Sequence, residues 1–233
     1  MKYLLEVSNM RVVVRLGGSV IASPLNSHLI AEYIDLLKEL KRQGHKVVAV
    51  VGGGLLAREF IRVAAELDLK EKEKDWVAIH VSRLFAQLFM LCLDKNGCGS
   101  VPVSLDGVEA CLGSGKIVVL GGLSPGMTTD SVAALIGERI KADLLVKSSN
   151  VDGIYDKDPK KYSDAKKLEV IMFDELDSFF EADSHRAGIN QIIDPEAVKI
   201  LKRCKLKTVV VNGYYSENVL AAVNGKKVGT VIT

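Results

Sequence analysis

Short runs of apolar, mostly β-branched residues alternate along the chain with longer segments whose apolar residues recur every three to four positions. The runs are typical of buried strands, and the longer spacing is typical of amphipathic helices. The strands predicted in this way cover residues 12–14, 47–51, 117–120, 144–147 and 208–211. The predicted helices cover residues 26–43, 55–67, 76–93 and 129–141, stretches near 173–180 and 195–203, and a last helix before a short final strand. Because the strands are apolar throughout, we expect an α/β fold in three αβα layers around a mostly parallel sheet.

The chain has 233 residues, a length that suits a single domain over residues 1–233. Residues 70–75 alternate in charge and predict a solvated connection between two helices. Met10 stands directly before the first predicted strand, so residues 1–9 are expected to be an accessory extension or to precede an alternative start. The intact mass of natively expressed protein distinguishes these two.

Composition excludes several classes of protein. The 48% hydrophobic content is too high for a disordered chain. With 31 basic and 29 acidic residues, the net charge of +2 is too small for nonspecific nucleic-acid binding. We find no apolar stretch approaching the roughly 18–20 residues that cross a bilayer, so we expect a cytoplasmic protein without a membrane partner. The four cysteines form no Cys-x-x-Cys pair, which favours buried free thiols over a zinc site or a disulfide framework.

Glycine carries the first functional signal. Nine of the 20 glycines lie in four loops that follow predicted strands. These loops are Gly17-Gly18-Ser19, Gly52-Gly53-Gly54, the segment from Gly121-Gly122 to Gly126, and Ser149-Asn150-Val151-Asp152-Gly153. Glycine lets backbone N–H groups converge without obstruction by a Cβ, and ligands of such sheets bind at the carboxyl ends of the strands. Any one of these loops is better explained as a tight turn between a strand and a helix, but four converging loops predict a phosphate-binding site.

Two familiar phosphate-binding motifs have partial matches in the sequence. The segment Gly113-Ser114-Gly115-Lys116-Ile117 lacks the first glycine and the hydroxyl of a P-loop, which excludes that motif. Gly52-x-Gly54-x-x-Ala57 matches the dinucleotide-binding pattern, and Asp75 has the spacing of its ribose-binding acid. Asp75 follows a charged segment and no strand, so the dinucleotide hypothesis stays open on the glycine spacing alone.

Several motifs together resemble a known family. They are Gly17-Gly18-Ser19, Val51-Gly52-Gly53-Gly54 with Arg58, Pro125-Gly126-Met127-Thr128-Thr129-Asp130, Asn150-Val151-Asp152-Gly153-Ile154-Tyr155 with Asp158-Pro159, Ile193-Asp194-Pro195 and Val228-Gly229-Thr230. The chain resembles the amino acid kinase superfamily from about residue 10 to its end. The Pro-Gly-x-Thr-Thr-Asp stretch makes it most similar to the archaeal-type uridylate (UMP) kinases.

The resemblance implies transfer of the ATP γ-phosphate to UMP with Mg²⁺, in a homohexamer built as a trimer of dimers. It implies an acceptor-binding half over about residues 10–145 and an ATP-binding half over about 146–233. The residues implied for ATP are Gly18, Ser19, Gly54, Arg58, Ser149, Asn150, Tyr155 and Asp158. Those implied for UMP are Gly53, Asp75, Leu123, Ser124, Pro125, Gly126, Met127, Thr128 and Thr129. No protein side chain is expected to be a dedicated metal ligand.

Two residues are expected to be catalytic. Arg15 stands where many relatives carry lysine, and Asp130 is the counterpart of a carboxylate that organises the phosphate-binding groups. A carboxylate that only stabilises a helix N-terminus is the alternative for Asp130. Lys147 is equally well explained as a nucleotide contact or as a surface lysine. An acceptor phosphate is already ionised, so no general base is needed.

Other departures from the family keep alternatives open. Ser82-Arg83-Leu84-Phe85-Ala86 differs from the Thr-Arg-x-Asn-Ala of archaeal relatives, and Met127 replaces an expected histidine. A related kinase with another small acceptor is one alternative. A nucleotide-binding storage or regulatory protein without turnover is another, and Arg15 is the residue that supports it.

Overall fold

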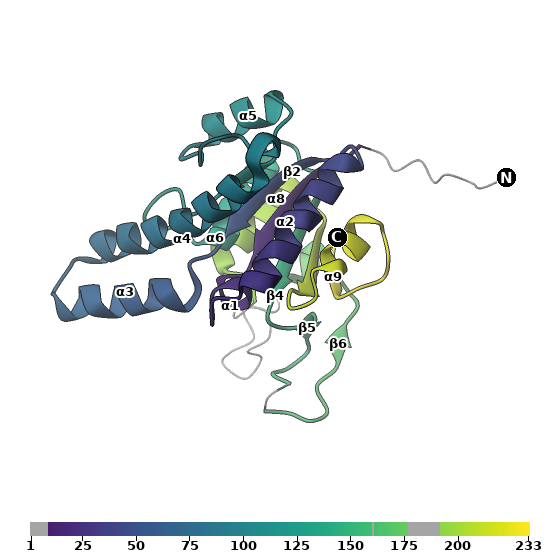
Figure 1. The fold of residues 1–233 in the computed structure, drawn as a ribbon. Helices are drawn as coiled ribbons and strands as arrows, with labels where there is room; N and C mark the ends of the chain where they lie inside the picture. The colour runs from purple at the N-terminus through teal and green to yellow at the C-terminus, as the bar shows by residue number, and fades with distance from the viewer. Residues whose placement is uncertain (1–8, 160, 177–191) are drawn as a thin grey trace.

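The computed structural model describes residues 9–159, 161–176 and 192–233. Within them, seven strands form one sheet in the order β3-β2-β1-β4-β8-β9-β7 (Figure 1). Their bounds are β1 Arg11–Leu16, β2 Lys46–Val51, β3 Val118–Leu120, β4 Leu144–Ser149, β7 Val170–Ile171, β8 Thr208–Asn212 and β9 Thr230–Ile232. The first five strands of that order pair in parallel, and β9 is antiparallel to β8. A two-stranded antiparallel ribbon of β5 (Ile154–Tyr155) and β6 (Lys167–Leu168) stands apart from this sheet.

Helices cover both faces of the sheet, which confirms the expected three layers. The helices are α1 Gly18–Ile21, α2 Ser27–Arg42, α3 Gly54–Glu66, α4 Glu71–Leu93, α5 Leu105–Gly113, α6 Thr129–Arg139, α8 Pro195–Cys204 and α9 Glu217–Val223, with short 3₁₀ turns η1 (Asp94–Asn96) and η2 (Phe173–Glu175). Strand β1 shows how the faces divide. Val12 and Val14 pack with α2, α4 and α9, whereas Val13 packs with α5, α6 and α8. Alternate residues of a strand point to opposite faces, so one apolar run supplies both cores.

The structure of the charged segment of residues 70–75 was predicted wrongly. α4 begins at Glu71, so the residues taken for a solvated connection form its first turns. Glu71 and Glu73 lie where the helix dipole favours negative charge, and Glu73 Oε2 accepts a hydrogen bond of 2.8 Å from the Lys70 backbone N–H. α5 was also not predicted. Of the stretch near 173–180, the structure describes η2, and residues 177–180 lie outside the described residues.

The prediction of buried free thiols was wrong as well. Cys98 and Cys111 form a disulfide with Cα atoms 5.6 Å apart, Cys92 is exposed, and Cys204 is half-buried. Gly97, next to Cys98, forms an isolated β-bridge with Ile117, which lies just before β3. Helix α5 then brings Cys111 close to Cys98. The pairing depends on the path of α5, which the spacing of the cysteines does not reveal.

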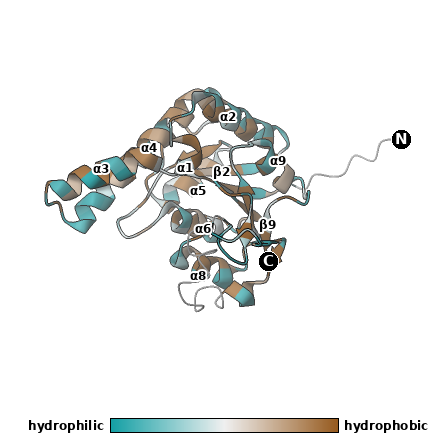
Figure 2. Cartoon of the chain, turned by 90° about the horizontal axis from the view of Figure 1, so that it is seen from below, coloured by the Kyte–Doolittle hydropathy of each residue, from teal (hydrophilic) through white to brown (hydrophobic). Residues whose placement is uncertain are grey.

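The helices α3 and α4 project together from the body of the molecule (Figures 1 and 2). Several apolar side chains on this pair are exposed, namely Leu55, Phe60, Val63, Leu67, Trp76, Leu84, Leu88 and Leu91. Among the described residues, one helical segment, Glu71–Asn96, is long and apolar enough by length and composition alone to cross a bilayer. Its other face is buried in the core through Phe85, Phe89 and Leu93, as in the core helix of a globular domain.

Candidate active site

The carboxyl ends of five adjacent parallel strands lie along one edge of the sheet. The four predicted loops follow β3, β2, β1 and β4, and a fifth loop, after β8, also contains a glycine, Gly213. The order of the strands therefore brings together loops that are far apart in the sequence. This edge is where ligands bind in open α/β sheets.

The loops after β1 and β2 touch through their backbones. A Cβ on Gly18 would overlap the backbone of Gly54, and a Cβ on Gly52 would lie 2.9 Å from the Gly18 nitrogen. Gly54 also has φ +60°, a conformation that side-chain-bearing residues rarely adopt. These glycines are thus needed for the two loops to meet, whatever they bind.

Three charged side chains form a buried cluster beneath the loops. β1 and β4 place Arg15 and Lys147 directly opposite each other, which brings two positive charges together. Asp130, in the first turn of α6, lies between them. Its Oδ1 is 2.6 Å from Arg15 Nε and 2.5 Å from Lys147 Nζ. Arg15 Nη2 also donates to Thr129 Oγ1 at 2.8 Å.

Burial and charge shift the pKa values in this cluster. Burial opposes ionisation of Asp130, but the two neighbouring cations outweigh it and hold the pKa of this carboxyl below its ordinary value. Burial, aided by Arg15, lowers the pKa of Lys147 to about 8 against the opposing pull of Asp130. The Lys147 side chain is only 7% exposed, so its interpretation as a surface lysine was wrong. With all three groups charged, the cluster carries one net positive charge at the strand ends.

Two helix caps hold the segment that precedes Asp130. Thr128 caps α6 by accepting from the backbone N–H of Ser131 at 3.1 Å. Asp194 caps α8 and also accepts from Thr128 Oγ1 at 2.5 Å and from Ser131 Oγ at 2.8 Å. The two helix N-termini are thereby fixed to each other next to the charged cluster. The role of Asp194 was not predicted, although its position before Pro195 is a helix-start signal.

α4 holds the loop of residues 123–129 from the other side. Asp75 Oδ2 accepts from the Gly126 backbone N–H at 2.7 Å. Arg83 donates to the carbonyls of Gly122 and Leu123, at 3.0 and 3.1 Å. Ser82 Oγ accepts from Gly122 N–H at 2.8 Å. The sequence analysis did not predict that Ser82 and Arg83 hold this loop. The available signal was that both residues lie in the segment 82–86, which differs from the family motif.

The remaining members of the predicted acceptor set lie in or beside this loop. Met127 and Leu123 are half-buried against the core, and Ser124 accepts from the Met127 N–H through its carbonyl. Gly53 is the N-cap of α3, and a Cβ there would lie 2.5 Å from the Ala57 Cβ. A methyl group at Gly53 would therefore point into the start of α3.

The residues predicted to bind ATP, the phosphate donor, fall into two groups. Gly18, Ser19 and Gly54 lie at the contact between the first two loops, and Arg58 is exposed on α3. Ser149, Asn150, Tyr155 and Asp158 lie at and beyond the end of β4, where the Tyr155 hydroxyl donates to Asp152 Oδ1 at 2.8 Å.

A buried hydrogen-bond network supports the end of β4. The fully buried Tyr33 hydroxyl lies 2.6 Å from Ser148 Oγ and donates to the Gly213 carbonyl at 2.8 Å. The Ser148 carbonyl in turn accepts from the Gly17 N–H at 3.0 Å. This network ties the ends of β1, β4 and β8 together, and Tyr33 was not predicted to contribute.

The described residues do not form a protein metal site. Among them, no three histidine, cysteine or carboxylate side chains lie close enough together to hold an ion. The carboxylate best placed for one, Asp130, already contacts two cations. The residues present thus fit an anion-binding site, in which any divalent cation would be held chiefly by phosphate oxygens.

Comparisons with known proteins agree with this geometry. The amino acid kinase family matches residues 10–212. A uridylate kinase of Methanocaldococcus jannaschii is 43% identical over 225 residues, covering 96% of this chain and 99% of that protein. A uridylate kinase of Methanobrevibacter smithii is 39% identical over 223 residues, with coverage of 96% and 99%.

Solved structures give the same result. The crystal structure of the uridylate kinase of Archaeoglobus fulgidus superposes with a TM-score of 0.86 at 38% identity, covering 96% of this chain and all of that one. A UMP kinase of Bacillus anthracis, at 20% identity and a TM-score of 0.82, shares the fold. The chain belongs to the amino acid kinase family.

Proposed function

We propose that this protein is a UMP kinase, which transfers the γ-phosphate of ATP to UMP and yields UDP and ADP. The uridylate kinases that match nearly the whole chain support this activity. The observation that carries it is the buried cluster of Arg15, Asp130 and Lys147 at the meeting point of the glycine loops. Phosphoryl transfer depends mainly on positioning and on positive charge around the migrating group, and this cluster supplies both.

The reaction needs no protein base. An oxygen of the ionised UMP phosphate attacks the γ-phosphorus, and the bond from this phosphorus to the bridging oxygen breaks as ADP leaves. Arg15 and Lys147 stabilise the charge on the transferred group. Asp130 keeps these two neighbouring cations in place, which makes it chiefly a positioning residue for them.

The two substrates occupy different loops in this proposal. Gly18, Ser19, Gly54 and Arg58 bind the ATP phosphates, while the segment after β4 binds its base and ribose. The loop of residues 123–129 binds UMP with Gly53 and Asp75. The acceptor half then covers about residues 10–145 and the ATP half about 146–233, within one domain. Mg²⁺ accompanies ATP and neutralises phosphate charge when bound.

The protein is further proposed to be a cytoplasmic homohexamer, a trimer of dimers, in pyrimidine nucleotide biosynthesis. The exposed apolar side chains of α3 and α4, such as Phe60 and Leu84, support association of copies, because such surfaces are usually covered in an assembly. Light scattering of the purified protein measures the number of copies.

A coupled assay of ADP release tests the activity. It compares UMP, CMP, dUMP and acetylglutamate as acceptors, each with ATP and Mg²⁺. We expect turnover with UMP. Turnover with acetylglutamate alone would favour a related kinase with another acceptor, and binding of ATP without turnover on any acceptor would favour a storage or regulatory protein.

A further inference from the structure

A cavity lies on the sheet away from the edge formed by the carboxyl ends of the parallel strands, which we call the catalytic edge. It has a volume of about 560 Å³ and lies on the α9 side of β8, β9 and β7. Its floor is apolar. Val209 pairs with Val231, and Val231 pairs with Val170, so three adjacent strands present valines to the same face. Val170 is 54% exposed, so solvent reaches this floor.

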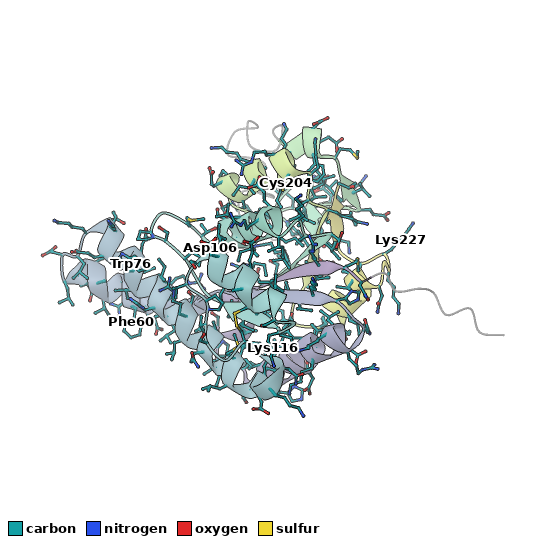
Figure 3. All side chains as sticks on the ribbon, turned by 90° about the horizontal axis from the view of Figure 1, so that it is seen from above. Phe60, Trp76, Asp106, Lys116, Cys204 and Lys227 are labelled. Carbon is teal, nitrogen blue, oxygen red and sulfur yellow. A yellow bond between two sulfur atoms is a disulfide. The ribbon has the colours of Figure 1, made fainter. Side chains whose placement is uncertain are left out.

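The rim of the cavity is strongly basic. Lys167, Lys207, Lys226 and Lys227 line it, whereas Glu169 is the single acid among the described residues that do so. Lys207, Lys226 and Lys227 form no ion pair with any residue that the structure describes. Figure 3 shows Lys227 on the loop after α9, far from the projecting helices α3 and α4, which contain Phe60 and Trp76. Several unpaired lysines around one concave surface concentrate positive potential there.

We propose that this cavity binds a nucleotide at a site separate from the catalytic edge. A planar base would lie on the valine floor, and its phosphates would interact with Lys226 and Lys227. The volume is in the range of small-molecule sites, about 300–1,000 Å³. The cavity reaches Lys207, just before the amino end of β8, whereas the catalytic loops follow the carboxyl ends.

The site has a direct structural connection to the proposed ATP pocket. Lys167 Nζ donates to Asp152 Oδ2 at 3.1 Å, and Asp152 Oδ1 accepts from the Tyr155 hydroxyl. Phosphates in the cavity would compete with Asp152 for Lys167 and so loosen the support of Tyr155. Occupancy would then weaken ATP binding at the catalytic edge, a consequence that rests on the proposed function, and the coupling would be reciprocal.

Methyl NMR of the full chain with labelled valines tests the proposal, with ATP as the probe. We expect ATP to shift the signals of Val170, Val209 and Val231. The double substitution Lys226→Gln/Lys227→Gln is expected to weaken the response of these three signals at least about tenfold. Val20, in α1, reports the catalytic edge separately, so a failure of ATP to bind there is distinguishable from a failure in the cavity.

The matched control is Lys72→Gln/Lys95→Gln, which removes the same charge from two exposed positions elsewhere and is expected to leave the response unchanged. The proposal is overturned if millimolar ATP leaves the three valine signals in place, or if their shifts persist in Lys226→Gln/Lys227→Gln. If inorganic tripolyphosphate alone shifts the valine signals as strongly as ATP, the role of the base is overturned.

Discussion

Lys147 Nζ lies 2.5 Å from Oδ1 of Asp130, and both side chains are almost fully buried. The same carboxylate oxygen contacts Arg15, so a single negative charge separates two cations on neighbouring strands. Removing one partner of a buried ion pair leaves the other charge uncompensated, which costs far more than losing a surface pair. The expected behaviour of this cluster follows from that asymmetry.

Asp130→Asn is expected to lower kcat at least about 100-fold, because Arg15 and Lys147 lose the group that positions them. We also expect the fold to persist with an unfolding free energy lower by about 3 kcal/mol. Steady-state kinetics and urea unfolding measure the two effects. If the unfolding free energy falls by the expected amount but kcat changes little, Asp130 has only a structural role.

Activity is expected to fall as the pH rises through about 8, since burial lowers the pKa of Lys147 to about 8 and its positive charge is then lost. In Lys147→Arg this decline should move to higher pH, because the guanidinium stays charged. The pH profile of kcat from about pH 6.5 to 9.5 measures the effect. An identical alkaline decline in Lys147→Arg would assign it to another group.

Stability has the opposite dependence on pH in that range. The folded pKa of Lys147 is below its unfolded value of 10.5, so the unfolded chain binds more protons between about pH 8 and 10.5. Lys147 therefore makes the free energy of unfolding rise with pH in this window, and its penalty is fully present below about pH 8. Comparing this slope with that of Lys147→Met isolates the contribution.

Gly53→Ala is expected to lower stability, because the new methyl group would lie 2.5 Å from the Ala57 Cβ. Because Gly53 is proposed to bind UMP, the steric overlap at this position should also raise KM for UMP, while KM for ATP changes less. The double variant Gly53→Ala/Ala57→Gly removes the steric overlap, at a helix-propensity cost of about 1 kcal/mol, and should recover KM for UMP. Unchanged UMP binding in Gly53→Ala would contradict the acceptor role of this loop.

The disulfide is expected to contribute to stability without affecting the chemistry. Cys98 and Cys111 are separated by 13 residues, and closing a loop of that size stabilises a fold by about 3 kcal/mol in the chain-entropy account. Reduction should lower the melting temperature of the native chain but leave Cys98→Ser/Cys111→Ser unchanged. Alkylation of the unreduced protein with mass analysis checks the pairing, since two modified cysteines are expected and four would refute it.

Sequence periodicity determined the layers of the fold and most of its strands. The apolar β-branched runs have no polar face, so they had to lie inside a sheet covered on both sides. Glycines after successive strands then predicted loops at one edge. Where local signals were ambiguous, tertiary context decided. Charged residues at the start of α4 belong to the helix because its dipole and the packing of its later turns stabilise them.

The tertiary structure alone decided the partners of the charged groups. Arg15 is more than 100 positions away from both Asp130 and Lys147 in the sequence. Local patterns therefore reveal neither the strand register that places Arg15 opposite Lys147 nor the position of Asp130 between them. The support of the loops by Arg83, Asp194 and Tyr33, and the Cys98–Cys111 bond, depend in the same way on long-range packing. Periodicity reports which face of an element is buried, whereas contacts between elements depend on strand order and helix paths that local patterns do not encode.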